Sequence, residues 1–192
     1  ISDITISAGA TTGTASFTPT DDSVYEGNET GIVAISTVSG GSATEDGTQS
    51  VTITITENES SPTITLATSA TSIAENAGSS LTLTATSSIA ADEDITVSIS
   101  TSGTGTEGTD YSTISDITIS AGDTTGTASF TPSDDSVYEG NETGIVAISG
   151  VSGADAAESG SQSVTITITE NDSSPTITLA TSATSIAENA GS

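Results

Sequence analysis

Carboxylates are the side chains with chemistry to offer in this sequence, and they come in short, regular runs. The clearest run is Asp134-Asp135-Ser136-Val137-Tyr138-Glu139-Gly140-Asn141-Glu142, which places four acids and an asparagine within nine residues. Carboxylate, amide and backbone carbonyl oxygens are the ligands that Ca²⁺ takes from proteins, roughly six to eight at a time and in flexible geometry. Mg²⁺ fits such a run less well, because it demands tight octahedral coordination and keeps its waters.

No other side-chain chemistry competes with the acids, since the 192 residues include no Lys, Arg, His, Cys, Met or Trp. The 26 Asp and Glu residues therefore give a formal net charge of −26. Without cationic side chains, a phosphate clamp, nucleic-acid binding through counterion release and attraction to anionic lipid are all excluded. We expect no nucleic-acid partner and no direct membrane insertion.

The same absences exclude most enzymes. A His general base, a Cys nucleophile, a Schiff-base Lys and a His or Cys zinc site all need residues that the sequence lacks. An Asp-pair hydrolase is the one class left open. Asp134 and Asp135 are adjacent, so their side chains diverge, and nothing in the sequence indicates a substrate cleft. We therefore expect a protein that is not an enzyme.

An internal repeat organises the chain. Residues 1–79 align without a gap on residues 114–192 at a constant offset of 113, and 70 of the 79 positions are identical. A period above 100 residues is too long for a solenoid unit, so each repeat should be a domain with its own core. We expect three pieces: the C-terminal part of one repeat over 1–61, a complete repeat over 62–174, and the N-terminal part of the next over 175–192.

Within the complete repeat, apolar residues alternate with Thr and Ser at a period of two, as in Leu81-Thr82-Leu83-Thr84-Ala85-Thr86. Thr favours strands while keeping the outer face soluble, so this alternation argues against disorder despite the high charge. The pattern predicts seven strands, near residues 63–66 (resuming near 72–73), 81–86, 95–99, 117–119, 128–130, 145–148 and 164–168. Seven short strands in this length predict an all-β fold, with each repeat an immunoglobulin-like antiparallel β-sandwich.

Strand order then predicts where the acids meet, because the odd-numbered strands of such a chain all end at one tip. Eight of the repeat's carboxylates follow those strands: Glu75, Asp110, Asp134, Asp135, Glu139, Glu142, Glu170 and Asp172. Without Lys or Arg they would repel one another, and burial would raise their pKa values. Bound Ca²⁺ removes that conflict. The alternative is a solvated acidic surface, the interpretation we give to the acids elsewhere: Asp92, Glu93, Asp94, Asp116, Asp123, Asp155 and Glu158.

Four blocks of the complete repeat resemble the Calx-beta domain and occur in that family's order. They are Ile73-Ala74-Glu75-Asn76-Ala77-Gly78, Gly108-Thr109-Asp110-Tyr111, the acidic run from Asp134 to Thr143, and Val164 to Asp172. The resemblance implies a Ca²⁺-binding β-sandwich in which the eight converging acids are metal ligands. One departure is Asn171, since the family often carries three consecutive Asp there. A neutral ligand at Asn171 implies that one ion site is weaker or missing.

The repeat extends these implied ligand roles to the two incomplete repeats. Their counterparts of the ligand acids are Asp21, Asp22, Glu26, Glu29, Glu57 and Glu59 in the first repeat, and Glu188 in the third.

These observations predict a calcium-binding structural module of an extended extracellular repeat protein, such as an adhesin stalk or surface filament. The last strand ends at the acidic tip, and Ser173-Ser174-Pro175 leads directly into the next repeat, so ions there would fix the angle between repeats. We expect neighbouring repeats as partners, or identical chains in a filament or bundle. The alternative is a Ca²⁺-sensing regulatory domain of a larger membrane or signalling protein, in which near-identical tandem copies are unexpected.

Overall fold

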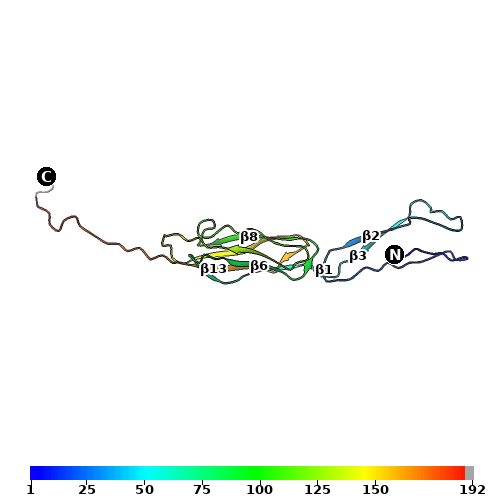
Figure 1. The fold of residues 1–192 in the computed structure, drawn as a ribbon, viewed down its shortest axis with the longest axis horizontal. Helices are drawn as coiled ribbons and strands as arrows, with labels where there is room; N and C mark the ends of the chain where they lie inside the picture. Colours follow the sequence, from blue (N-terminus) through cyan, green and yellow to red (C-terminus); the bar gives the residue numbers. More distant parts are fainter. Residues whose placement is uncertain (189–192) are drawn as a thin grey trace.

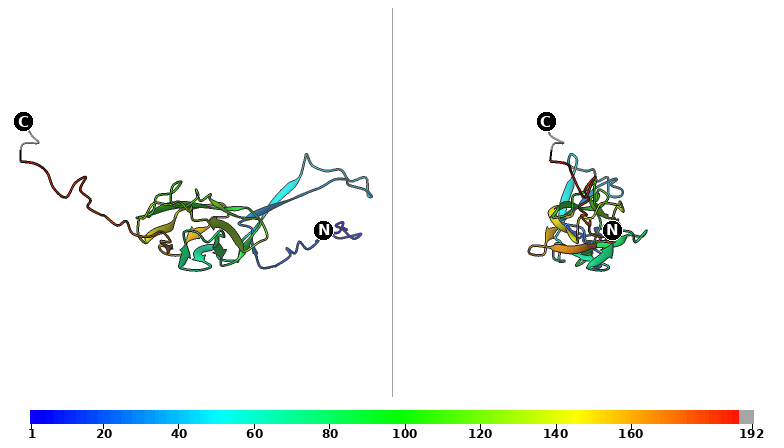
Figure 2. Two further views of the ribbon diagram at one scale, coloured as in Figure 1. Left: turned by 60° about the vertical axis from the view of Figure 1, so that its left-hand side comes forward. Right: turned by 90° about the vertical axis from the view of Figure 1, so that its left-hand side faces the viewer.

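A computed structural model describes residues 1–188, and every helix or strand assigned in that range is a β-strand. Among these residues we find no helix long and apolar enough to cross a bilayer. The chain is elongated, with a β-sandwich at its centre (Figure 1). A β-hairpin of the first repeat extends from one end of the sandwich, and the C-terminal segment leaves from the other end (Figure 2).

The complete repeat forms two sheets, whose strand orders are β10-β6-β4-β12 and β5-β13-β11-β8-β9. All seven predicted strands are present, so the predicted β-sandwich is confirmed. The first predicted strand divides at its break into β4 and β5, which join different sheets. The strands are β4 (Thr63–Thr68), β5 (Ser72–Ala74), β6 (Leu81–Ser87), β7 (Ala90–Ala91), β8 (Ile95–Gly103), β9 (Ile117–Ile119), β10 (Thr125–Phe130), β11 (Glu142–Ser152), β12 (Ala157–Glu158) and β13 (Ser163–Thr169).

The core lies between these two sheets and follows the alternation of the sequence. One face of each long strand supplies buried side chains, among them the fully buried Ile64, Leu83, Val97, Val146 and Ile166. Removing this apolar surface from water is the main favourable contribution to folding.

An aromatic pair supports the loop that carries Asp110. Tyr111 stacks on Phe130 with ring centroids 4.6 Å apart, and both rings are buried. Gly144 on β11 leaves room for this pair, since a Cβ there would lie 2.7 Å from a ring carbon of Phe130. The packing of the core therefore reaches the base of the acidic tip.

The first repeat contributes three strands, β1 (Val24–Tyr25), β2 (Glu29–Ala34) and β3 (Ser50–Ile55). The β2–β3 hairpin has the same register as β11 and β13, from Glu29 opposite Ile55 to Ala34 opposite Ser50. Among the described residues this hairpin forms a two-stranded sheet of its own, and Val51 is largely exposed, whereas its counterpart Val164 packs against the core. β1 instead pairs with β7 of the complete repeat.

The C-terminal segment shows how strongly these strands depend on their partners. Residues 175–188 contain no strand, although their sequence repeats 62–75. Ile177 and Leu179 are 93% and 101% exposed, whereas their counterparts Ile64 and Leu66 are 0% and 7% exposed. Identical sequence is buried only where the rest of the sandwich is present.

Candidate metal centre

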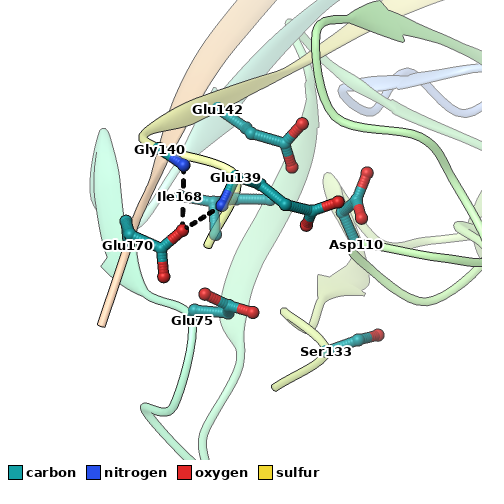
Figure 3. Close-up of a pocket in the computed structure, with 8 residues that line it drawn as sticks. All are labelled: Glu75, Asp110, Ser133, Glu139, Gly140, Glu142, Ile168 and Glu170. Carbon is teal, nitrogen blue, oxygen red and sulfur yellow. Dashed lines mark hydrogen bonds between the residues drawn. The ribbon is translucent and has the colours of Figure 1, made fainter. Parts of the chain in front are cut away.

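Acidic side chains from four separate segments meet at one tip of the sandwich (Figure 3). Glu75 follows β5, Asp110 lies in the loop after β8, and Glu139 lies in the loop between β10 and β11. Glu142 opens β11, and Glu170 follows β13. These five carboxylates line a single recess.

The carboxylates form two groups of three. In one group, Glu75, Glu170 and Asp172 each place a carboxylate oxygen within 4.8 Å of the others. In the second group, Asp110, Glu139 and Glu142 do the same. Oxygens this close to one another can bind one cation together, so each triad could hold an ion.

Glu170 fastens the long acidic loop to the end of β13. Its carboxylate accepts backbone N–H groups from Asp172 (2.7 Å), Glu139 (2.7 Å) and Gly140 (2.9 Å). The Glu170 N–H in turn donates to Asn141 Oδ1 at 3.0 Å. The Asp172 and Glu139 amides, opposed by partial burial, lower the pKa of Glu170 to about 2, because they stabilise the charged form. Glu170 is therefore an anion at neutral pH.

Four other acids of this tip are less easily ionised than Glu170. Burial raises the pKa values of Glu75, Glu139, Glu142 and Asp172, and neighbouring carboxylates add to the effect. Glu75 is only 8% exposed. The sequence offers no Lys, Arg or His to offset these charges.

One buried carboxylate oxygen at this tip lacks a partner. Within residues 1–188, no group donates a hydrogen bond to the buried Asp172 Oδ2. Buried polar atoms without a hydrogen-bond partner are rare, and a bound cation is one ordinary way to satisfy such an atom. The donor set consists only of oxygens, which hard divalent cations such as Ca²⁺ prefer. The residues at the tip therefore fit Ca²⁺.

Two further acids lie beside the triads. The Asp135 N–H donates to Glu75 Oε1 at 3.3 Å, and Asp135 Oδ1 accepts the Val137 N–H at 2.6 Å. Asp134 Oδ1 accepts a hydrogen bond from Asn171 Nδ2 at 3.2 Å. An Asp at position 171 would face the Asp134 carboxylate, so the neutral amide lowers repulsion in the ion-free tip.

The first repeat reproduces the same loop anchor without the rest of the domain. Glu57, the counterpart of Glu170, accepts the N–H groups of Glu26 (2.6 Å), Gly27 (2.8 Å) and Glu59 (2.9 Å). Backbone hydrogen bonds lower the pKa of Glu57 to about 2. The first-repeat acids share one recess, lined among others by Asp21, Asp22, Glu26, Glu29, Glu57 and Glu59.

The first-repeat recess is lined by counterparts of six of the eight ligand acids. The counterparts of the other two, Glu75 and Asp110, correspond to positions before Ile1. Glu188 is the third repeat's counterpart of Glu75, and it is exposed on the C-terminal segment and belongs to neither triad. Among the described residues, both carboxylate triads lie in the complete repeat, and the predicted ligands Asp134, Asp135 and Asn171 belong to neither triad.

Several acids outside the two triads accept hydrogen bonds from the protein, although the sequence indicated only a solvated surface for most of them. Asp94 Oδ1 accepts the Ala121 N–H at 2.8 Å, and Asp116 Oδ1 accepts the Ile99 N–H at 2.9 Å. Glu107 lies near the tip in sequence, but its carboxylate accepts Thr101 Oγ1–H and the Ile114 N–H, and so it braces its own loop. Hydrogen bonds to loop amides leave no signature in residue spacing.

The fold and the tip together define a class of protein, an immunoglobulin-like β-sandwich whose loops gather carboxylates into groups that could hold a metal ion. The model of the Calx-beta domain family matches residues 2–59 and 57–173. The chain therefore belongs to the Calx-beta domain family, whose domains are calcium-binding modules, and the resemblance carried by the four sequence blocks is confirmed.

Several solved structures are similar to this chain. The crystal structure of the apo form of the Calx CBD1 domain is similar over 58% of this chain and 99% of its own, with 17% sequence identity and a TM-score of 0.47. No curated protein matches the sequence.

Proposed function

We propose that this protein is a calcium-binding structural module of an extended extracellular repeat protein, such as an adhesin stalk or surface filament. In this function, Ca²⁺ at the acidic tip stiffens the connection between successive repeats. Neither catalysis nor nucleic-acid binding forms any part of it.

The observation that carries the proposal is the position of the first triad. Glu170 and Asp172 follow β13 directly, and Ser173-Ser174 then leads to Pro175, the first residue of the next repeat. An ion shared by Glu75, Glu170 and Asp172 would hold the departing chain against its own domain. The short linker, which contains a proline, leaves little slack for the next repeat to move.

The near-identity of the repeats supports a structural function over a sensing one. A sensor needs one or two units tuned to a signal, whereas 70 identical positions out of 79 indicate a homogeneous array. A calcium-rich exterior would keep weak sites filled, which supports a place outside the cell. The absence of Lys and Arg also leaves trypsin-like proteases without a cleavage site.

The test is small-angle scattering on a chain in which the third repeat is complete. Residues 175–192 are identical to 62–79, so a copy of residues 80–174 added after Ser192 finishes that repeat with its own sequence. We expect a narrow, rod-like distance distribution in Ca²⁺ and a broader, shorter one after chelation. Mg²⁺ at the same concentration should not restore the rod.

Calorimetric titration of the same sample with Ca²⁺ separates binding from stiffening. If Ca²⁺ binds but the scattering profile is the same with and without chelator, the stiffening part of the proposal is wrong. If no Ca²⁺ binds, the acids are a solvated surface and the whole proposal fails.

A further inference from the structure

The acidic loop of the first repeat, residues 21–30, contacts the complete repeat through a short stretch of sheet. β1 runs parallel to β7, with Val24 opposite Ala90 and Tyr25 opposite Ala91. The Asp92 N–H donates to the Tyr25 carbonyl oxygen at 3.1 Å. Figure 1 shows β1 at the end of the sandwich, where the first repeat meets the second.

The Tyr25 side chain crosses the same junction. Its ring is partly buried against the core of the complete repeat. Its hydroxyl donates to Asp155 Oδ2 at 3.0 Å, and this hydrogen bond raises the pKa of Tyr25. The backbone of Asp155 has a φ of 50°, in the turn between β11 and β12, so a tight turn fixes the acceptor.

Within residues 1–188, the same loop in the complete repeat has no such neighbour. Residues 134–143 repeat residues 21–30 without a single change. Val137 and Tyr138 are nevertheless 58% and 47% exposed, whereas Val24 and Tyr25 are partly buried. The counterparts of Ala90, Ala91 and Asp92 in the following repeat would lie past Ser192.

The turn that presents this dipeptide is the same at both tips. The Val24 N–H donates to Asp22 Oδ1 at 2.8 Å, and the Val137 N–H donates to Asp135 Oδ1 at 2.6 Å. The loop therefore has the same local hydrogen bond in its docked and undocked copies. An exposed Val-Tyr pair is already shaped to receive a strand edge.

We propose that the acidic loop is a two-sided joint. Its carboxylates face its own domain, and its Val-Tyr dipeptide docks on the following repeat. Val137 and Tyr138 are thus the binding surface for one partner, the next repeat of this sequence. They pair with its counterpart of β7, and the Tyr138 hydroxyl donates to its counterpart of Asp155. This inference rests on the proposed function only in taking the repeats to follow one another in the working protein, since the docked contact is made by the β1–β7 pairing and the Tyr25–Asp155 hydrogen bond.

The acceptor of this contact lies in the most variable block of the repeat. Five of the nine differences between the two copies fall in residues 41–48 and their counterparts 154–161, and Asp155 corresponds to Ser42. A serine can accept the tyrosine hydroxyl only as a neutral partner, which gives a weaker hydrogen bond than a carboxylate. Successive joints in the array therefore differ in strength.

Hydrogen exchange at the Asp92 amide tests the contact in the chain as it exists. This amide is protected only through Tyr25, so Tyr25→Ala should speed its exchange by about tenfold or more. Tyr138→Ala is the matched control, because it removes the same residue from the same loop where nothing is docked. It should leave exchange at Asp92 unchanged. Tyr25→Phe and Asp155→Ser should give smaller increases.

Spin-label distances give a second measurement that does not depend on one amide. The sequence has no Cys, so Thr52→Cys on β3 and Thr127→Cys on β10 would label two exposed positions on either side of the joint. We expect a narrow distance distribution that Tyr25→Ala broadens and Tyr138→Ala does not. Each of the three labelled proteins is measured in excess Ca²⁺ and after chelation.

The outcomes separate this inference from the proposed function. A narrow distribution with and without Ca²⁺ supports the docked joint and counts against stiffening by the ion. A distribution that is narrow only in Ca²⁺ supports both. A broad distribution in both conditions, or equal effects of Tyr25→Ala and Tyr138→Ala, overturns the joint whether or not Ca²⁺ binds.

Discussion

Replacing Glu75 with Gln should change stability in opposite directions with and without Ca²⁺. Glu75 is buried beside Glu170 and Asp172, and burial raises the pKa of its carboxyl. In chelator, Glu75→Gln removes a charge that the folded state holds unfavourably, so the variant should be more stable than the wild type. In Ca²⁺, the same change removes a ligand from the first triad and should be destabilising.

The size of the calcium effect follows from the two triads. An ion that binds only the folded state contributes about 2.7 kcal/mol when its concentration is about 100 times its dissociation constant. Two ions therefore contribute about 5.4 kcal/mol. A domain of this size gains about 4 °C in Tm per kcal/mol, so Ca²⁺ should raise the wild-type Tm by about 20 °C. Loss of one triad should halve that shift to about 10 °C.

Differential scanning calorimetry measures the Tm of the wild type and of Glu75→Gln, each in excess Ca²⁺ and after chelation. Asp123→Asn is the matched control, because it also removes one negative charge, but from an exposed residue outside the tip. It should leave the Ca²⁺-induced shift unchanged. An equal Ca²⁺-induced shift in Glu75→Gln and wild type would show that the first triad holds no ion. If Glu75→Gln were less stable than the wild type in chelator, the account of the buried charge would be refuted.

Three other perturbations give separate checks. Gly144→Ala should lower the free energy of unfolding by about 1–3 kcal/mol in chemical denaturation, because its Cβ would lie 2.7 Å from a ring carbon of Phe130. The equivalent change in the first repeat, Gly31→Ala, should be close to neutral, because its Cβ would lie 3.4 Å from the nearest ring carbon of Phe17. In chelator, lowering the pH from about 7 to about 5 should raise the Tm, because the tip carboxyls with raised pKa values bind protons more tightly in the folded state than in the unfolded state. In Ca²⁺, the same change in pH should lower the Tm, because protons compete with the ion for these carboxylates. Asn171→Asp should lower the Tm in chelator, since it places a second carboxylate where the amide now donates to Asp134, and should tighten Ca²⁺ binding in calorimetric titration.

Much of the fold could be predicted because two simple regularities determine it. Alternation at a period of two locates every long strand, and the parity of an antiparallel chain decides which loops share a tip. Glu75 and Glu170 meet for that reason, although they are 95 residues apart in the sequence. Neither regularity shows that the first strand splits between the two sheets at its break.

The finer features depend on three-dimensional packing and could not be predicted. The division of the acids into two triads depends on loop geometry, and so does the capture of three amides by Glu170. The contact of Tyr25 with Asp155 depends on a neighbouring domain, and in the sequence Asp155 was indistinguishable from a solvated acid. Ile64 and Ile177 occupy equivalent positions in identical sequence, yet only the first is buried.

The parallel pairing of β5 with β13 has a consequence for a chain under tension. In this pairing, Ser72–Ala74 of β5 lie opposite Thr167–Thr169 of β13. These are the first and last strands of this sheet in chain order, and they run in the same direction. A pulling force that enters at the start of the repeat and leaves at its end slides these strands along each other. All of their hydrogen bonds then resist together, whereas an antiparallel pair pulled from one end opens bond by bond. Glu75 and Glu170 extend from the ends of these two strands, so an ion between them would clamp the two segments that the load draws apart.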